Sequence, residues 1–232
     1  MKQNTYEVKK NVDKVLSGKF TGFLSSNIRL EVEKCLRKAE YDKFVPFEEA
    51  EKIILYSGYC PRVRLFQLCC YKDDEIKHSS IMGSLYGLNI SGDMFGDIVK
   101  WKENFYVYLL DDICDLVISE FNFVGNVYVR LKEVPLDFLS EFRREYEKIE
   151  LIVSSLRIDT VISKLIGCNR DCVHEKIRDN DILVNEVIEK KVSTVLKVGD
   201  VFSVRRYGKF CFREIVGRTK KDNFIIVINK YV

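Results

Sequence analysis

The sequence predicts an α+β protein in three parts: a helical N-terminal region, an α/β middle domain, and a C-terminal module of two helices with a small β-sheet. Three observations lead to this prediction. Apolar residues recur at helical spacing over residues 1–60, the period changes to alternation near residue 62, and two short helix patterns followed by short strands close the chain. The predicted domains are 1–60, 61–150 and 151–232.

The N-terminal region is expected to be helical throughout. Residues 8–16 and 28–36 each place apolar side chains at i, i+4, i+7 and i+8 or a close variant of that spacing. A third short helix is expected over 46–58, with Ile53 and Ile54 on its apolar side. The sequence therefore predicts a small helical domain before the period changes.

The middle region shows the order β-α-β-β-α-β. The expected elements are a strand at 63–68, a helix at 79–88, strands at 97–101 and 104–109, a helix at 111–121 and a strand at 127–131. This order is the pattern of a split βαβ sandwich, which RNA-recognition (RRM-like) folds use. The acidic run 73–75 is expected to be a loop, and residues 136–153 are expected to be connecting structure.

Two features of the middle region resemble catalytic motifs but have simpler explanations. The glycines at 83, 87, 92 and 96 lack the G-x-G-x-x-G spacing and the lysine of a phosphate-binding loop. Close packing of a helix on the sheet is the favoured explanation, and close approach of the backbone to RNA is the alternative. Asp111 and Asp112 are expected to begin a helix rather than to act as paired catalytic carboxylates.

The C-terminal module follows from local physical chemistry. A short helix is expected from residue 156 to Gly167, with Ile158, Val161, Ile162 and Leu165 as its apolar stripe. Asn169 is a suitable N-cap for a second helix over 170–178. Asn180 stands where a left-handed residue is needed to leave that helix. Short strands are expected at 182–184 and 201–204.

The basic charge of the chain is concentrated in this module. The whole chain carries a net charge of +3, but residues 154–232 hold 16 Lys and Arg against 10 Asp and Glu, a net +6. The remaining 153 residues are slightly acidic. A basic C-terminal end on a mildly acidic body favours a polyanionic partner.

Cysteine usage and hydropathy indicate the compartment. The eight cysteines lie at 35, 60, 69, 70, 114, 168, 172 and 211, without C-x-x-C pairs, as expected for reduced thiols of a cytoplasmic protein. The C-x3-C-x-H spacing at 168–174 has no evident fourth ligand, so no zinc site is expected. No signal peptide and no membrane-spanning segment is expected either.

The C-terminal residues resemble the S4 domain, an RNA-binding module named after a small-subunit ribosomal protein. The matching anchors are Leu156-Arg157-Ile158-Asp159, Asn169-Arg170, Ile177-x-x-Asn180-x-Ile182-x-Val184-Asn185 and Gly199-Asp200-x-x-x-Val204. The chain departs from the usual pattern at Asn169, where Ser is common, and at Asn180, where Gly is common. Both replacements preserve the local physics, because Asn caps helices and tolerates the left-handed region.

The resemblance extends to the YlmH family of bacterial RNA-binding proteins. The segments that carry it are Gly83-x-x-x-Gly87-Leu88-x-Ile90 with Gly96-Asp97-Ile98, Ser203-Val204-Arg205-Arg206-x-Gly208-Lys209-Phe210, and Gly217-x-Thr219-Lys220-Lys221. Residues 60–64 and Ser91-Gly92 depart from the family pattern. The resemblance implies a ribosome-associated protein that contacts ribosomal RNA and tRNA on the large subunit and takes part in the quality control of stalled nascent chains.

The expected RNA-binding residues combine the S4 anchors with the basic residues around two predicted hairpin turns. They are Arg157, Asp159, Asn169, Arg170, Lys176, Arg178, Asn185, Arg205, Arg206, Tyr207, Lys209, Arg218, Lys220 and Lys221. Arginine and lysine neutralise phosphates, and an exposed tyrosine stacks on bases. Asn185 has two open explanations: a hydrogen bond to a ribose, or support of its own turn.

The sequence thus predicts a non-enzymatic, monomeric RNA-binding protein of the bacterial cytoplasm, with no cofactor, no metal and no small-molecule substrate. Two alternatives remain. One is an RNA-modifying enzyme of the pseudouridine synthase or methyltransferase type, although neither the synthase motif nor a glycine-rich cofactor loop is found. The other is a protein–protein adaptor whose basic face meets an acidic partner.

Overall fold

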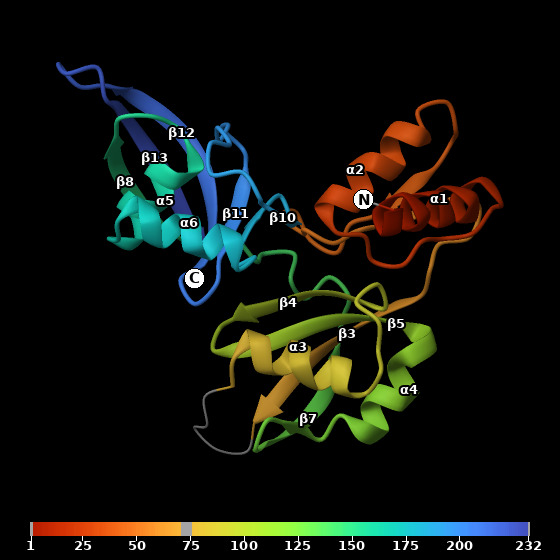
Figure 1. Ribbon diagram of the computed structural model, residues 1–232. Coiled ribbons are helices and arrows are strands. Elements are labelled where there is room, and N and C mark those ends of the chain that lie inside the picture. Colours follow the sequence, from red (N-terminus) through yellow and green to blue (C-terminus); the bar gives the residue numbers. More distant parts are fainter. Residues whose placement is uncertain (1, 71–75, 232) are drawn as a thin grey trace. The chain divides into compact units, whose positions relative to one another are not determined.

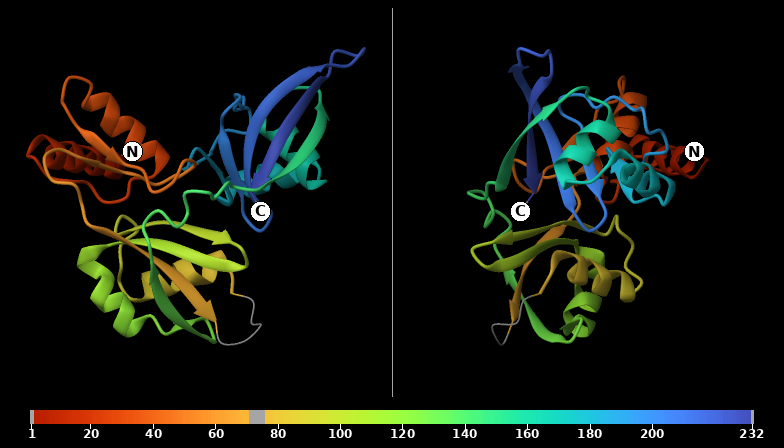
Figure 2. Two further views of the ribbon diagram at one scale, coloured as in Figure 1. Left: turned by 180° about the vertical axis from the view of Figure 1, so that it is seen from behind. Right: turned by 60° about the vertical axis from the view of Figure 1, so that its left-hand side comes forward.

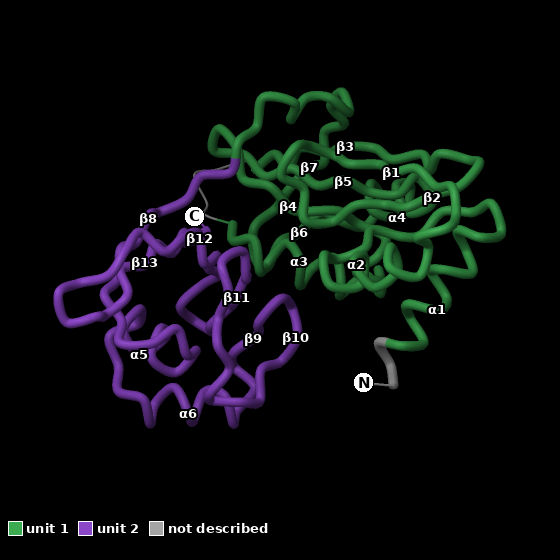
Figure 3. The backbone as a smooth tube through the Cα atoms, turned by 90° about the horizontal axis from the view of Figure 1, so that it is seen from above, with its two compact units in different colours: residues 1–143 green, residues 144–232 purple. Residues whose placement is uncertain are grey.

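The computed structural model describes residues 2–70 and 76–231, so the acidic run 73–75 expected to be a loop lies outside the described residues. The chain forms two compact units, residues 1–143 and 144–232 (Figure 3). Helices and antiparallel sheets occur in both units, which confirms the α+β class. The finer division at 1–60, 61–150 and 151–232 stays a prediction.

The N-terminal part of the first unit contains two helices and a small hairpin. Its elements are α1 (Lys2–Leu16), α2 (Ser26–Cys35), β1 (Asp42–Phe44) and β2 (Ile54–Tyr56), with β1 antiparallel to β2. The third helix expected over 46–58 is therefore wrong. Ile53, Ile54 and Leu55 are consecutive and all buried, which a helix with one apolar face cannot achieve but a strand covered on both sides can.

The rest of the first unit is an antiparallel five-stranded sheet with two helices (Figure 1). The elements are β3 (Val63–Cys70), α3 (His78–Gly87), β4 (Phe95–Trp101), β5 (Asn104–Leu110), α4 (Asp111–Glu120), β6 (Phe123–Val124) and β7 (Val127–Val134). The strand order is β4-β5-β3-β7-β6. The predicted order of elements is confirmed, with the short strand β6 added.

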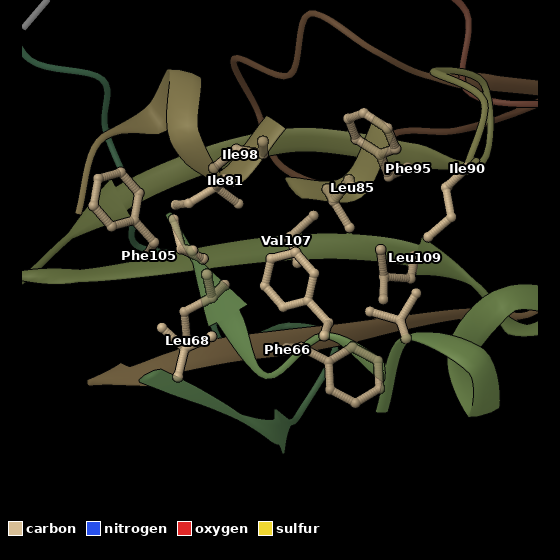
Figure 4. Packing of buried hydrophobic residues seen from close by; sticks show 14 of the residues in the cluster. Phe66, Leu68, Ile81, Leu85, Ile90, Phe95, Ile98, Phe105, Val107 and Leu109 are labelled. Atoms are coloured by element: carbon tan, nitrogen blue, oxygen red, sulfur yellow. The ribbon is translucent and has the colours of Figure 1, made fainter. Parts of the chain in front are cut away.

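One face of this sheet is covered by α3 and α4. Ile81 and Leu85 of α3 belong to one buried cluster with Phe66 and Val107 of the sheet (Figure 4). Asp111 and Asp112 occupy the first turn of α4, where the helix dipole favours carboxylates, while the cap position itself is Leu110.

The glycines expected to pack a helix on the sheet do so only in part. A Cβ built on Gly83 or Gly87 would meet nothing within 4 Å, so the packing explanation is wrong for these two exposed helix residues. At Gly96, by contrast, a Cβ would lie 3.0 Å from Phe23 and 3.1 Å from the Cβ of Tyr108. Close packing therefore requires a glycine in strand β4 and not in helix α3.

The second unit is a six-stranded antiparallel sheet with two helices. The elements are β8 (Tyr146–Val153), α5 (Ile158–Ile166), α6 (Arg170–Arg178), β9 (Ile182–Val184), β10 (Val187–Ile188), β11 (Val201–Val204), β12 (Gly208–Arg218) and β13 (Phe224–Tyr231). The strand order is β10-β9-β11-β12-β13-β8, and α5 and α6 contribute to the core that covers one face (Figure 1).

Strand β8 corrects the expectation that residues 136–153 only connect two domains. Ile149, Leu151 and Val153 alternate with charged or exposed residues and pack into the core of the second unit. β8 pairs with β13 over eight residues, from Tyr146↔Tyr231 to Val153↔Phe224. The chain therefore enters the second unit before residue 151, and the sheet is larger than the small sheet expected.

Local predictions for the two helices of the second unit are confirmed. Gly167 ends α5 in the left-handed conformation at φ 69°, and the side chain of Asn169 accepts a hydrogen bond from the Cys172 amide at 2.9 Å. Asn180 has φ 61°, as the exit from α6 requires.

Within residues 2–70 and 76–231, every helix falls short of the length and apolar character that a membrane crossing needs.

Candidate nucleic-acid interface

Two arginines meet at the start of α5. Arg157 immediately precedes the helix, and its backbone bridges to Val195, while Ile158 and Val161 anchor the helix in the core. Arg170 is the first residue of α6 and reaches back to the first turn of α5. The sequence prediction that both arginines project from one end of the helix pair therefore agrees with their contacts.

Asp159 holds Arg157 with two hydrogen bonds. The Nε and Nη2 atoms of Arg157 donate to the two carboxylate oxygens of Asp159 at 3.1 and 2.8 Å. The carboxylate is 1% exposed, whereas the Arg157 side chain is 41% exposed. A two-point contact to a buried carboxylate fixes the plane of the guanidinium and leaves its outer edge toward solvent.

Arg170 is held through the neighbouring residue, Thr160. Its Nη2 donates to Thr160 Oγ1 at 2.6 Å, and Thr160 Oγ1 also lies 3.3 Å from Asp159 and 3.0 Å from Ser155 Oγ. One buried pair, Asp159 and Thr160, therefore positions both arginines.

His174 completes the cluster and was missed in the sequence prediction. Its Nε2 lies 3.4 Å from the second carboxylate oxygen of Asp159. The signal was available in the sequence, because His174 is four residues after Arg170 and the two therefore share one face of α6. Asp159 is thus shielded from solvent and positions Arg157 and His174, while its assignment to RNA binding stays a prediction.

The electrostatics of Asp159 reflect these partners. Burial on its own would raise the pKa of the carboxyl, but the hydrogen bonds from Arg157, His174 and the Thr160 amide lower the pKa to about 2. The same pairing raises the pKa of Arg157. The carboxylate therefore stays ionised at every physiological pH and keeps the arginine in place.

A second basic group surrounds the turn between β11 and β12. The ammonium of Lys176 lies 5.1 Å from the centre of the Tyr207 ring, and Arg205 pairs with Asp181 at 3.2 Å. Arg206 occupies the turn with φ 70° and is exposed, as is Tyr207 at 42%. A cation above an exposed ring forms a surface that suits a phosphate next to a stacked base.

A third group lies at the turn between β12 and β13. Arg218 pairs with Asp222 at 2.6 Å and lies 4.1 Å from the ring centre of Phe224, while Lys220 and Lys221 are exposed. This turn and the β11–β12 turn lie at opposite ends of β12, which is 11 residues long, or about 35 Å. The basic run 205–221 therefore divides into two separate surfaces.

The remaining candidates have mainly structural contacts. Asn185 donates to Asp200 at 2.9 Å and accepts from the Val201 amide at 3.0 Å, so its side chain supports the β9–β10 turn against β11. Asn169 caps α6. Arg178 lies 3.9 Å from Glu175 at the exposed end of α6, and Lys209 lies 5.1 Å from the ring centre of Tyr231.

The comparisons with known proteins agree with an RNA-binding role for part of the chain. Residues 63–137 match the family model described as "Putative RNA-binding domain in YlmH". The chain is 26% identical over 189 residues to "Ribosome-associated protein quality control protein P2" of Bacillus subtilis. The matched segment covers 78% of this chain and 74% of that protein. These matches confirm the resemblance predicted from the sequence.

A solved structure is also similar. It is described as "Cell division protein ylmH from Streptococcus pneumoniae", is 18% identical, and matches 58% of this chain and 88% of the other with a TM-score of 0.44.

Proposed function

Because the chain resembles the YlmH family and its residues 63–137 match the RNA-binding domain of that family, we propose that it is a non-enzymatic RNA-binding protein of the ribosome. Its second unit acts as an S4 domain that binds structured ribosomal RNA. The middle of the first unit acts as an RRM-like domain, and the strand order β4-β5-β3-β7 supports this assignment because it is the order of a split βαβ sandwich.

The observation that carries the proposal is the arginine pair. Arg157 and Arg170 are both tied to the buried Asp159–Thr160 pair, so their guanidinium groups are oriented before any ligand arrives. Structured RNA is recognised largely through the geometry of its backbone phosphates and ribose hydroxyls. Two pre-oriented guanidinium groups suit that geometry, because each binds phosphate oxygens with a fixed fork of donors.

The second basic group extends this surface. Lys176 and Tyr207 link the far end of α6 to the β11–β12 turn, which also carries the exposed Arg206. An RNA helix that contacts the arginine pair would meet a further set of cations along α6. We assign the Arg218, Lys220 and Lys221 turn to a separate contact, since it lies at the other end of β12.

The proposed cellular role of this chain is taken from the name of its B. subtilis relative. The B. subtilis protein is named for ribosome-associated quality control, and this chain is proposed to serve the same process in the cytoplasm, on the large subunit, near a tRNA. It is proposed to act as a monomer without a cofactor.

The test is co-sedimentation with ribosomal subunits at moderate salt. We expect the Arg157→Ala/Arg170→Ala double variant to lose at least about tenfold in affinity, because two phosphate contacts disappear. Arg37→Ala/Arg213→Ala removes the same charge from two exposed positions outside the proposed surface and is the matched control. If the first variant co-migrates with the subunits as the wild type does, the assignment of the site is wrong. Turnover of modified RNA by the wild type would favour an enzyme instead.

A further inference from the structure

The five-stranded sheet has a second face, which points away from α3 and α4 (Figure 2, left) and carries a buried cluster that includes Val99, Tyr106 and Tyr108. Near Tyr108, the sheet is covered by Phe47, which stacks on Tyr108 with ring centres 6.2 Å apart and meets Phe142 edge to face with ring centres 5.3 Å apart. Tyr108, Phe47 and Phe142 are all buried. The other half of the face, toward Trp101, carries a different set of residues.

An aromatic cluster lies at this second half. Phe138 is 5.6 Å from Trp101 and 5.4 Å from Tyr106 between ring centres. Tyr106 is buried, Trp101 is half-buried and Phe138 is 39% exposed. Trp101 and Phe138 are therefore both partly exposed, and both contact the buried ring of Tyr106.

Cations adjoin the same rings. The ammonium of Lys102 lies 4.2 Å from the centre of the Trp101 ring. Lys132 is exposed and is directly opposite Gln67, which is directly opposite Tyr106, so all three side chains share this face. Arg130, opposite Cys69 one row further along, is exposed on the same face.

We propose that this half-face is a binding site for an unpaired RNA segment of a few nucleotides, with Trp101 and Phe138 as the stacking surface. This proposal rests on the proposed RNA-binding function and extends it to a second, separate site in the first unit. Bases stack on exposed aromatic rings when they are not paired, and lysine and arginine beside the rings neutralise the adjoining phosphates. Gln67 and Asn104 are both half-buried on this face. The Asn104 Nδ2 donates to the Lys102 carbonyl at 2.9 Å, so the Gln67 amide and the Asn104 amide oxygen are the groups that can bind base edges.

Several features favour an unpaired strand over the alternatives. A paired helix hides its bases and would use the cations but not the rings. An acidic peptide would use the cations without stacking. The combination of two accessible rings with Lys102, Arg130 and Lys132 suits a ligand that has both planar bases and phosphates.

The chain offers a direct probe of this site, because Trp101 is its only tryptophan. A base stacked on the indole quenches its fluorescence. We expect an unstructured eight-nucleotide oligoribonucleotide to quench Trp101 emission of the full chain saturably at low salt. A hairpin RNA without unpaired bases and an acidic peptide of equal charge are expected to leave the emission unchanged.

Phe138→Ala is expected to weaken this binding about tenfold, since a stacking partner is lost. Phe123→Ala is the matched control: Phe123 is 57% exposed in the same unit but contacts Tyr128 in another part of the sheet, and its loss should leave the affinity unchanged. Lys102→Ala/Lys132→Ala is a second test, which keeps all three rings but removes the Lys102 contact with Trp101; Lys34→Ala/Lys38→Ala on the surface of the N-terminal part is its control.

The proposal is overturned if the oligonucleotide leaves Trp101 emission unchanged, if Phe123→Ala weakens binding as much as Phe138→Ala, or if the hairpin or the peptide quenches as well as the single strand. The outcome of this fluorescence experiment can be distinguished from the outcome of the ribosome co-sedimentation experiment that tests the proposed function. Arg157→Ala/Arg170→Ala should keep the oligonucleotide quenching while losing co-sedimentation, so either site can fail alone.

Discussion

At the scale of single residues, a buried carboxylate organises the exposed cations. Asp159 accepts hydrogen bonds from Arg157, His174 and the Thr160 amide, and Thr160 in turn receives one from Arg170. A buried charge with this many partners is stable, while the same charge without them would be strongly unfavourable. The sequence identified the two arginines, but their common support is visible only in the folded chain.

Asp159 also predicts how stability depends on pH. Its pKa is about 2 in the folded chain against 3.8 ordinarily, so its contribution is fully present above pH 4 and is lost as the pH falls toward 2. The size of the effect is roughly 2 kcal/mol. Hydrogen exchange of the α5 and α6 amides should show wild-type destabilisation between pH 4 and pH 2, and Asp159→Asn should lack that part of the pH dependence. Asp222→Asn, at an exposed position, serves as the control. An Asp159→Asn profile parallel to the wild type would contradict the argument.

At the scale of elements, the glycines divide into two classes. Gly83 lies in the exposed middle of α3 with open space around it, whereas a Cβ on Gly22 would overlap the backbone oxygen and the Cβ of Asp93. A glycine inside a helix is unfavourable unless something requires it, and a glycine at a close approach is required by its neighbour.

The two classes should respond oppositely to alanine. We expect Gly83→Ala to raise the free energy of unfolding of the first unit by about 0.5–1 kcal/mol, because helix propensity improves. Gly22→Ala should lower it by about 1–3 kcal/mol, since the backbone must shift. Urea unfolding followed by Trp101 fluorescence measures both. Destabilisation by Gly83→Ala would contradict this expectation, because it would mean that the folded first unit itself requires a glycine at this position.

Strand β8 shows why element prediction failed where it did. Its alternating pattern of Ile149, Leu151 and Val153 has the period of a strand, but charged residues at 141–150 mask it. The partner that makes it a strand, β13, is about 80 residues away in the sequence. Pairing over that separation is a tertiary fact, and no local pattern encodes it.

At the scale of the whole molecule, the concentration of positive charge in the second unit predicts how RNA binding responds to salt. If about four to six basic residues contact phosphates, ribosome affinity should fall about 10²- to 10³-fold between 50 and 200 mM salt. Co-sedimentation across that range measures the slope. The Arg157→Ala/Arg170→Ala variant should have a shallower slope, by about two contacts. A salt-insensitive wild type would contradict an interface built on phosphate contacts.

Much of the candidate site was predictable because its signals are local. The ends of α5 and α6 can be predicted from Gly167, Asn169 and Asn180. The positions of Arg157 and Arg170 follow from those helix boundaries. Asn185 was not decided by the sequence, because its amide binds Asp200 and Val201, 15 and 16 residues away. The basic run 205–221 was also ambiguous, since a strand of 11 residues separates its two ends.

By itself, the sequence determined the α+β class, the order of elements in the middle region, the helix boundaries in the C-terminal region and the family resemblance. These depend on periodicity, capping and short motifs, which act over a few residues. Only the tertiary structure decided which strands pair, that β8 joins the second sheet, that His174 supports Asp159, and that Trp101 and Phe138 contact each other. Those features depend on contacts between distant residues, which exist only once the core has packed.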